Sequence, residues 1–369
     1  MKKIVSAIIA LCITIVLVNF AKNSDVKLSY KLMPHPMPSL TATPTPRLKP
    51  LEVRASIPYW DQDNAFASFQ KNAAKFSHLS LFWYFLTAQG EIEKYQYASE
   101  DSKIIDFAHA NNVKVTAVIT NLPEKSGSTW DSERVEYILD DHAAQDYLIN
   151  QIAALLDAHN FDGVTVDFEA IIASERDNFS RFIETLSAAL HAHGKIVQVA
   201  LHPKNGSDQD KQYEFQDWRA LSSSADQVYI MAYGEHYDEG GPGPIASIPW
   251  VKKIIDYTRM FDLPLNKFYL GIPLYGYDWA EDKDAATGLT YTQVTALLDN
   301  LHIAADWDEN AKSPYFKYEQ NGVSHQVWFE DKDSVAAKVD LADKAGFAGV
   351  TFWRLGEEDP AVWNLFKDK

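Results

Sequence analysis

The sequence contains a single cysteine, Cys12, and that residue lies within an N-terminal apolar run. The rest of the chain therefore offers no thiolate for catalysis, no disulfide bond and no zinc site built on cysteine. The body of the chain also lacks a cluster of Lys and Arg, and its 34 basic residues face 51 acidic ones, for a formal net charge of −17. Nucleic acid, which attracts proteins through its phosphates, is therefore not an expected partner.

Motifs for several common chemistries are absent as well. The chain has no Gly-Lys-Ser phosphate loop, no dinucleotide-binding glycine fingerprint and no Gly-x-Ser-x-Gly nucleophile turn. His191 and His193 lie two residues apart on a predicted helix, so they point to different faces and do not form a metal site. We expect neither a cofactor nor a metal.

The N-terminus carries an export signal, because two lysines precede an apolar run. We predict residues 1–22 to be a signal peptide or an N-terminal membrane anchor. The run lies between a cleaved signal core and a bilayer span of ~20 residues in length, and Asn19 weakens the cleavage pattern, which favours the anchor. A lipoprotein site at Cys12 is disfavoured because Leu11 is bulky where a small residue is required. The remaining chain is expected outside the cytoplasm.

Residues 23–52 have a different composition, with six prolines between positions 34 and 50. Proline-rich segments are extended and do not bury a core. We interpret this segment as a linker that holds the following domain, residues 53–369, away from a membrane. No internal repeat and no small wall-binding module follows it.

Residues 53–369 alternate short β-rich runs with amphipathic helical patterns, such as those over 140–160 and 174–194. This alternation predicts parallel strands joined by helices. The eight predicted strands cover residues 53–60, 79–86, 113–120, 163–169, 196–203, 227–234, 268–277 and 349–356. Eight such units predict an α/β fold of the (β/α)8 TIM-barrel type. A doubly wound sheet is the alternative.

One connection is too long for a single crossover helix. About 70 residues separate the seventh and eighth predicted strands, with a helical pattern over 291–300 and a hairpin pattern over 315–329. We predict a small α+β insertion over about 281–331.

The stretch FDGVTVDFEAI places two carboxylates, Asp167 and Glu169, in an otherwise apolar strand. Because side chains alternate along a strand, Thr165 and the two carboxylates share one face, which we assign to the barrel axis. Such residues can cap a helix or satisfy backbone donors. Two neighbouring carboxylates at the carboxyl end of a barrel strand repel one another and raise one pKa, however, which favours a catalytic site.

These residues resemble the signature Asp-Gly-x-Asp-x-Asp-x-Glu of glycoside hydrolase family 18, the chitinase-like barrels. The chain has Asp162, Gly163, Asp167 and Glu169 at four of its positions. Segments that resemble the sixth, seventh and eighth strands of that family follow in order: QVYIMAYGEH, LGIPLYGYDW and AGVTFWRLGEED. The resemblance covers residues 53–369 and is closest to the spore-cortex and cell-wall lytic branch.

The resemblance implies a retaining reaction in which the N-acetyl group of the substrate attacks the anomeric carbon. Glu169 is then the general acid and base. Asp167 orients the acetamide, Tyr233 hydrogen-bonds its oxygen, and Trp353 forms the floor beneath the sugar. Met231 alternates onto the same strand face as Tyr233 and is assigned to substrate binding.

Two positions depart from the family pattern. Thr165 stands where many members have a further Asp, and we expect it in the substrate site, where it alters the pH profile without abolishing activity. Gly234 stands where members usually have an acidic residue that contacts substrate. Among the aromatic residues near strand ends, we assign Tyr275 and Trp83 to sugar binding.

We therefore expect a monomeric, extracytoplasmic glycosidase that cleaves β-1,4 bonds after N-acetylglucosamine, with peptidoglycan as its polysaccharide. Chitin oligomers are the alternative substrate. A glycan-binding lectin and a protein-recruiting scaffold are the alternatives from other classes, and the presence of Glu169 favours the enzyme.

Overall fold

The computed structural model describes residues 50–124 and 129–369. The predicted signal peptide or anchor, residues 1–22, lies outside the described residues, as does all but the end of the predicted linker, residues 23–52. No helix within the described part of the chain is both long and apolar enough to cross a bilayer.

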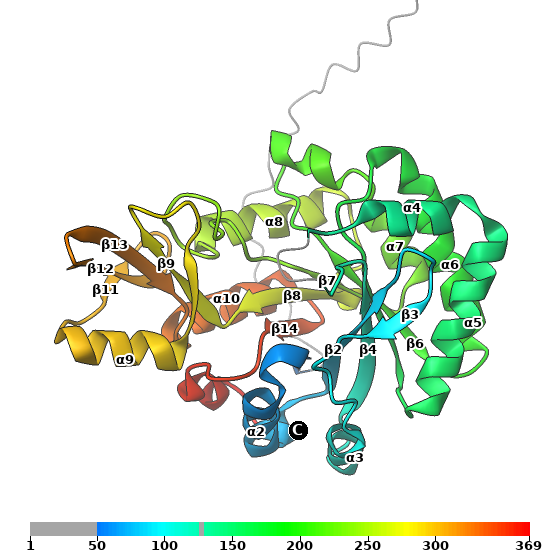
Figure 1. Ribbon diagram of the computed structural model, residues 1–369, viewed down its shortest axis with the longest axis horizontal. Coiled ribbons are helices and arrows are strands. Elements are labelled where there is room, and N and C mark those ends of the chain that lie inside the picture. Colours follow the sequence, from blue (N-terminus) through cyan, green and yellow to red (C-terminus); the bar gives the residue numbers. More distant parts are fainter. Residues whose placement is uncertain (1–49, 125–128) are drawn as a thin grey trace, which may run out of the picture. The chain divides into compact units, whose positions relative to one another are not determined.

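Eight parallel strands close into a barrel (Figure 1). The ring closes because the first strand pairs in parallel with both the second and the last. Its strands are β1 (Glu52–Pro58), β2 (His78–Leu86), β4 (Lys114–Thr120), β5 (Gly163–Asp167), β6 (Ile196–Leu201), β7 (Gln227–Ile230), β8 (Phe268–Pro273) and β14 (Gly349–Trp353). A short strand, β3 (Ile92–Lys94), pairs antiparallel with β2. The closed ring confirms the predicted (β/α)8 barrel and excludes a doubly wound sheet.

Helices follow the strands and cover the barrel. They are α2 (Gln62–Asn72), α3 (Ser102–Ala110), α4 (Ser132–Asp140), α5 (His142–Ala158), α6 (Arg176–His191), α7 (Trp218–Ser224), α8 (Ile248–Met260) and α10 (Lys332–Ala345). Helix α6 shows why they pack: Phe179 and Phe182 lie on its buried face, and the Phe168 ring lies 6.3 Å from each. The apolar face of the β5 segment is thus directed to the helices, as the alternation predicts.

Six barrel strands end two to four residues earlier than predicted, among them β5 at Asp167, β7 at Ile230 and β8 at Pro273. The residues that follow remain buried, as the 0% exposure of Ala232 and the 4% exposure of Leu274 show. An apolar pattern therefore continues in the sequence after the strand ladder has ended, which is why the predicted strands were too long.

The connection from β8 to α10 forms an antiparallel sheet of five strands with one helix. The sheet has the order β10-β9-β13-β12-β11. Its elements are β9 (Tyr275–Ala280), β10 (Thr287–Thr290), α9 (Tyr291–Leu301), β11 (Asp306–Asp308), β12 (Ser313–Gln320) and β13 (Val323–Phe329). In Figure 1 this insertion is yellow to orange and lies beside the barrel. The predicted α+β insertion is confirmed, and its first strand begins at Tyr275, within the segment predicted as a barrel strand.

At the amino end of β5, the first two letters of the signature have structural roles. Asp162 Oδ2 accepts a hydrogen bond from the Val115 N–H at 2.7 Å and lies 2.9 Å from His109 Nε2. A Cβ atom on Gly163 would lie 2.1 Å from the Ile196 carbonyl oxygen. Gly163 therefore permits the close approach of β5 and β6, and Asp162 fastens β5 to β4 and α3.

The amino end of β7 repeats this arrangement. Asp226 Oδ2 accepts from the Val197 N–H at 2.8 Å and lies 2.9 Å from His191 Nε2. His191 thus contacts a carboxylate that fastens β7 to β6 and α6.

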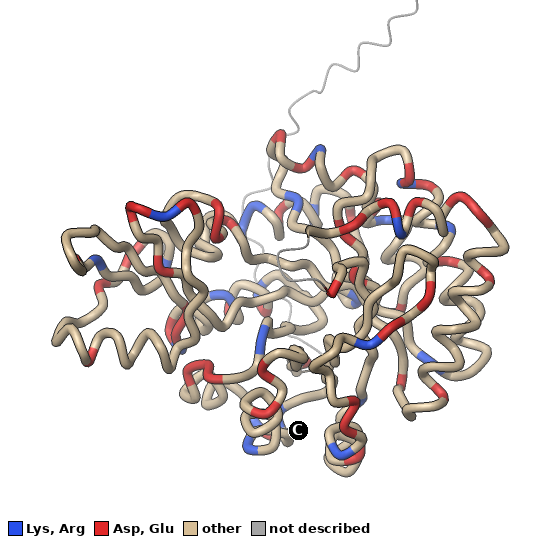
Figure 2. The backbone as a smooth tube through the Cα atoms, in the orientation of Figure 1, with Lys and Arg blue, Asp and Glu red and all other residues tan. Residues whose placement is uncertain are grey.

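Charged residues are distributed over both the barrel and the insertion. Figure 2 shows Lys and Arg positions scattered among the Asp and Glu positions on the outer helices and on the insertion. This distribution is in keeping with the acidic net charge of −17.

Candidate active site

Glu169 lies at the carboxyl end of the barrel, two residues beyond the last residue of β5. Asn121, which follows β4 and is fully buried, holds its backbone on both sides. The Asn121 Oδ1 atom accepts from the Glu169 N–H at 2.9 Å, and Asn121 Nδ2 donates to the Glu169 carbonyl oxygen at 2.8 Å. One amide side chain thus fixes the peptide groups that carry the candidate acid.

The Glu169 side chain is 16% exposed, and its Oε2 atom lies 2.9 Å from Nε2 of His202. His202 directly follows β6, and its ring stacks on Tyr213 with centroids 4.2 Å apart. Tyr213 belongs to the 3-10 helix η4 (Asp208–Tyr213). The candidate acid is thus accessible to a ligand on one side and held by an imidazole on another.

Asp167 is the last residue of β5 and is only 5% exposed. Its Oδ1 atom is buried and has no hydrogen-bond partner among the described residues. Burial raises the pKa of this carboxyl well above its usual range, and the nearby charge of Glu169 raises it further. This geometry fits the expectation that the neighbouring carboxylate raises one pKa of the pair, that of Asp167.

Thr165 is fully buried beneath Asp167. Its hydroxyl lies 2.9 Å from that of Thr116 and donates to Gln198 Oε1 at 2.9 Å. The line of polar side chains extends from Gln198 to Gln227, which also accepts from Arg54. Thr165 therefore belongs to a polar layer across the barrel interior, and its predicted contact with substrate does not fit its burial.

Tyr233 lies just beyond β7, where two tight turns follow the strand. Burial raises the pKa of its hydroxyl well above the ordinary value, and the proximity of Asp167 and Tyr275 raises it further. A Cβ atom on Gly271 would lie 3.1 Å from the Tyr233 ring. The absence of a side chain at Gly271 therefore leaves room for the ring to pack against β8. The structure thus brings Tyr233 to the two carboxylates.

Met231 and Tyr275 are placed at the same end of the barrel. The Met231 N–H donates to the Leu201 carbonyl at 2.8 Å, and its side chain is partly buried. Tyr275 packs with Tyr233 in one apolar cluster, but it comes from the first strand of the insertion.

Gly234 follows Tyr233 at the position where an acidic residue that contacts substrate was expected. The adjacent Glu235 does not take over that contact. Gly234 has a positive φ of 82°, and Glu235 accepts hydrogen bonds from both the N–H and the hydroxyl of Ser247. Ser247 is the N-cap of α8, so Glu235 stabilises a helix start and does not reach the site.

Trp353 is the last residue of β14 and is partly buried. Its ring lies 6.0 Å from that of Trp60 and 5.4 Å from that of Phe82. Trp60 is 49% exposed and follows β1, so an aromatic surface extends from Trp353 towards solvent.

Trp83 does not belong to this surface. Its ring is 0% exposed and packs against Tyr84 and Phe161. The register between β2 and β4 shifts between Phe82 and Tyr84, so Trp83 is the unpaired residue of a bulge. The assignment of Trp83 to sugar binding therefore does not fit, and Phe82 is the residue of this strand that contacts Trp353.

Comparison with known proteins identifies the family. Residues 55–358 match the family model described as glycosyl hydrolases family 18. The chain belongs to family 18 of the glycosyl hydrolases. The predicted family and the predicted class of enzyme, a glycosidase, are therefore confirmed.

Relatives of this family 18 chain include the cortical fragment-lytic enzyme of Bacillus anthracis, which is 30% identical over 72% of this chain and 62% of the relative. The crystal structure of the spore cortex-lytic enzyme SleL of Bacillus cereus superposes with a TM-score of 0.77, at 26% identity, over 85% of this chain and 73% of that one. A chitinase from Chromobacterium violaceum also gives a TM-score of 0.77, at 29% identity, over 86% and 98% of the two chains. The chain spans 61 to 69% of the length of the first curated relatives that it matches.

Sequence reasoning missed two residues of this family 18 site, Asn121 and His202, and did not select a third, Trp60, from the aromatic residues near strand ends. Asn121 and His202 contact Glu169, and Trp60 contacts Trp353. Each of them directly follows a barrel strand or lies within three residues of one. Polar and aromatic residues at the carboxyl ends of parallel barrel strands were therefore the signal that could have identified them.

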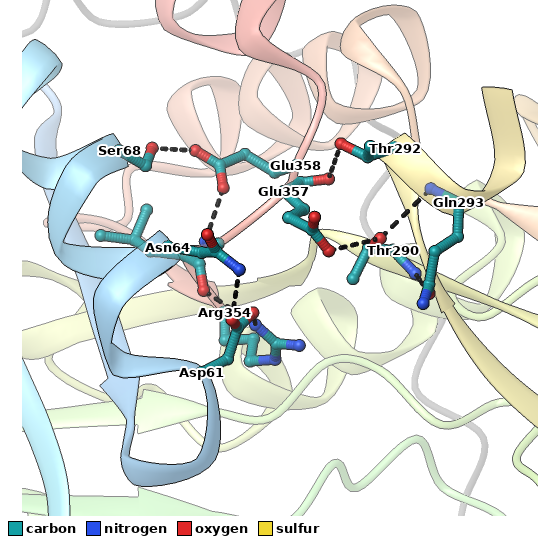
Figure 3. Close-up of polar contacts among 11 residues, drawn as sticks. Asp61, Asn64, Ser68, Thr290, Thr292, Gln293, Arg354, Glu357 and Glu358 are labelled. Carbon is teal, nitrogen blue, oxygen red and sulfur yellow. Dashed lines mark hydrogen bonds and ion pairs between the residues drawn. The ribbon is translucent and has the colours of Figure 1, made fainter. Parts of the chain in front are cut away.

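The loop after Trp353 contacts a helix of the family 18 barrel on one side and the insertion on the other (Figure 3). Arg354 pairs with Asp61 at 2.5 Å at the start of α2, and Glu358 contacts Ser68 on α2. On the other side, Glu357 Oε2 accepts from the Thr290 hydroxyl at 3.1 Å at the start of α9. The loop that follows the candidate floor residue is thus fixed between a barrel helix and the insertion.

Among the described residues, no group of three or more His, Cys, Asp or Glu side chains could hold a metal ion.

Proposed function

We propose that this protein is a retaining glycosidase that cleaves β-1,4 bonds after N-acetylglucosamine, with the N-acetyl group of the substrate as the nucleophile. Family 18 members use this substrate-assisted route instead of an enzyme carboxylate. The observation that carries the proposal is the difference between the two carboxyl groups: Asp167 is 5% exposed, whereas Glu169 is accessible beside it.

Asp167 is poorly suited to attack an anomeric carbon. Burial raises the pKa of Asp167, so the carboxyl group resists ionisation, and a protonated carboxyl group is a weak nucleophile. Its buried Oδ1 atom without a partner is well suited to accept the N–H of an acetamide. An acetamide bound there is oriented for its own oxygen to attack the sugar.

The remaining residues supply the other steps. Glu169 donates its proton to the glycosidic oxygen as the C–O bond breaks and the acetamide oxygen bonds to the anomeric carbon. Glu169 then accepts a proton from the water that opens the resulting oxazolinium ion, which restores the acid. Tyr233, whose raised pKa keeps its hydroxyl protonated, donates to the acetamide oxygen, and Trp353 lies beneath the sugar.

We propose peptidoglycan as the substrate. Support comes from the similarity to cortical fragment-lytic and spore cortex-lytic enzymes and from the predicted export segment at the N-terminus. In this proposal the domain acts outside the cytoplasm as a monomer, secreted or held at the membrane by that segment. Chitin oligomers are the second candidate, because the similarity to a chitinase is of the same extent.

Mass spectrometry of reaction products tests the proposal. Wild type and Glu169→Gln are incubated with purified peptidoglycan and, separately, with N-acetylglucosamine hexamer. Peptidoglycan fragments with reducing-end N-acetylglucosamine, formed by wild type alone, are the expected result. Cleavage of the hexamer alone would assign the protein to the chitinases, and binding without cleavage of either would make it a lectin.

A further inference from the structure

His202 makes a contact that the proposed reaction does not yet explain. Within residues 50–124 and 129–369, it is the side chain that hydrogen-bonds to the Glu169 carboxylate, through Nε2 and Oε2 at 2.9 Å. Its side chain is 11% exposed, so water competes little for this contact. A hydrogen bond to a charged carboxylate is among the stronger ones in proteins.

The imidazole is held in this orientation from several sides. Its ring stacks on Tyr213 at an interplanar angle of 19°, and the Phe215 ring packs edge to face with it at a centroid distance of 6.0 Å. The backbone N–H of His202 donates to Gln216 Oε1 at 2.8 Å, and this hydrogen bond fixes the backbone at the end of β6. A ring packed in this way presents Nε2 to Glu169 with little freedom to turn.

The contacts also indicate which ring nitrogen carries the proton. Nδ1 is buried and has no hydrogen-bond partner among the described residues. An N–H there would be left unsatisfied, whereas a lone pair there costs less. Nε2 faces a carboxylate oxygen, so Nε2 carries the proton and donates it to Glu169 Oε2.

We propose that His202 is a positioning residue that holds the Glu169 carboxylate through the hydrogen bond from Nε2 to Oε2. This inference rests on the role proposed for Glu169. Its ionised form is the one that must accept a proton from water in the second half of the reaction, and the fixed Oε2 atom leaves Oε1 to face the substrate.

The other titratable groups around this contact cannot take the place of His202. Burial and the Glu169 charge both disfavour a charge on Asp167 of β5, and burial raises the pKa of the Tyr229, Tyr233 and Tyr213 hydroxyls above their ordinary value. The Lys204 ammonium donates to the Gln216 carbonyl oxygen at 2.6 Å instead.

Two substitutions in the full-length protein separate the hydrogen bond from the packing of the ring. His202→Phe keeps the stack on Tyr213 and removes the donor, whereas His202→Gln keeps a donor near the position of Nε2. With N-acetylglucosamine hexamer, or with peptidoglycan if only that is cleaved, we expect His202→Phe to lower kcat about tenfold. KM should stay within about twofold, since His202 acts through Glu169.

Rescue by the conservative variant is the decisive readout. In His202→Gln, which keeps a donor, kcat should stay close to that of wild type. A folded His202→Phe variant with the wild-type kcat would overturn the role of His202, whereas full activity of Glu169→Gln would overturn the proposed function itself.

A measurement on the wild type keeps the inference testable should His202→Phe fail to fold. Ring 15N chemical shifts of histidine-labelled protein should show the His202 proton on Nε2 at neutral pH, and this resonance should shift in Glu169→Gln. A proton on Nδ1 would contradict the proposed donor.

Discussion

Asp162 and Asp167 lie at opposite ends of β5 and have opposite surroundings. At the amino end, Asp162 accepts from the Val115 N–H at 2.7 Å and contacts His109 at 2.9 Å. At the carboxyl end, Asp167 is 5% exposed, with one oxygen that lacks any partner among the described residues. The first carboxylate fastens the barrel together, and the second is left for a ligand to complete.

This difference distinguishes folding from function within one short motif. Satisfied buried polar groups stabilise a fold, whereas an unsatisfied buried carboxylate costs stability and is retained where a ligand makes use of it. The two ends of the strand should therefore respond in opposite ways to substitution. The predictions that follow test this contrast.

The largest effect is expected at the carboxyl end. Glu169→Gln should lower kcat by about two to four orders of magnitude, because the amide cannot donate the proton that a positioned general acid supplies. Glycan binding and the melting temperature should stay close to those of wild type. Steady-state kinetics with calorimetry would measure both, and turnover equal to that of wild type would refute the role of Glu169.

At the amino end, Asp162→Ala should reduce the free energy of unfolding by about 2–3 kcal/mol, since it leaves the buried Val115 N–H without an acceptor. The kcat of the folded protein should change by less than about threefold, because Asp162 lies at the end of the barrel away from the substrate. Urea denaturation and an activity assay measure the two quantities.

Asp226→Ala is the matched control, because Asp226 makes the same pair of contacts, to the Val197 N–H and His191. It should lose a similar amount of stability. A large loss of kcat in Asp162→Ala without a loss of stability would contradict the structural role.

The free energy of unfolding should also vary with pH because of a histidine at the amino end of the barrel strands. Burial, together with the nearby Arg54 charge, lowers the pKa of His78 at the start of β2 to about 2. The unfolded chain then binds more protons at acidic pH, so stability should fall below about pH 6.5 by up to ~1.4 kcal/mol per pH unit. Denaturation at several pH values should show a shallower fall in His78→Gln. An unchanged slope would contradict this assignment.

The smallest effect on stability is expected for Asp167→Asn, which should raise the free energy of unfolding at pH 7 by about 1–2 kcal/mol while turnover falls severely. Because the pKa of Asp167 is raised in the folded state, its charge costs stability above the pKa of the unfolded chain. The gain should therefore disappear as the pH approaches about 4. Denaturation of wild type and variant at both pH values measures this, and a variant less stable than wild type at pH 7 would contradict it.

The sequence was sufficient for the barrel, the insertion and the two carboxylates, because alternation and spacing are local properties. Phe168 packs against α6, and Thr165 faces the interior, as alternation requires. The ends of the strands could not be predicted, because Phe168 and Leu274 remain buried after the ladder has ended.

Contacts between distant segments were likewise beyond local patterns. The bulge at Trp83 depends on the register with β4, and the His202 contact joins residues 33 positions apart. The pairing of Tyr275 with Tyr233 depends on where the insertion begins. Each of these is determined by tertiary packing, which overrides what a single strand pattern indicates.

The most direct test of the central claim, that the acetamide of the substrate and not Asp167 attacks the sugar, is the dependence of cleavage on the N-acetyl group together with the anomeric configuration of the first product. Proton NMR in the first minutes of hydrolysis, on N-acetylglucosamine hexamer or peptidoglycan fragments, should show the β-anomer in excess before mutarotation. In the same assay, an oligosaccharide whose cleaved residue lacks the N-acetyl group should not be cleaved. An initial excess of the α-anomer, or cleavage of the substrate without the N-acetyl group, would contradict substrate assistance.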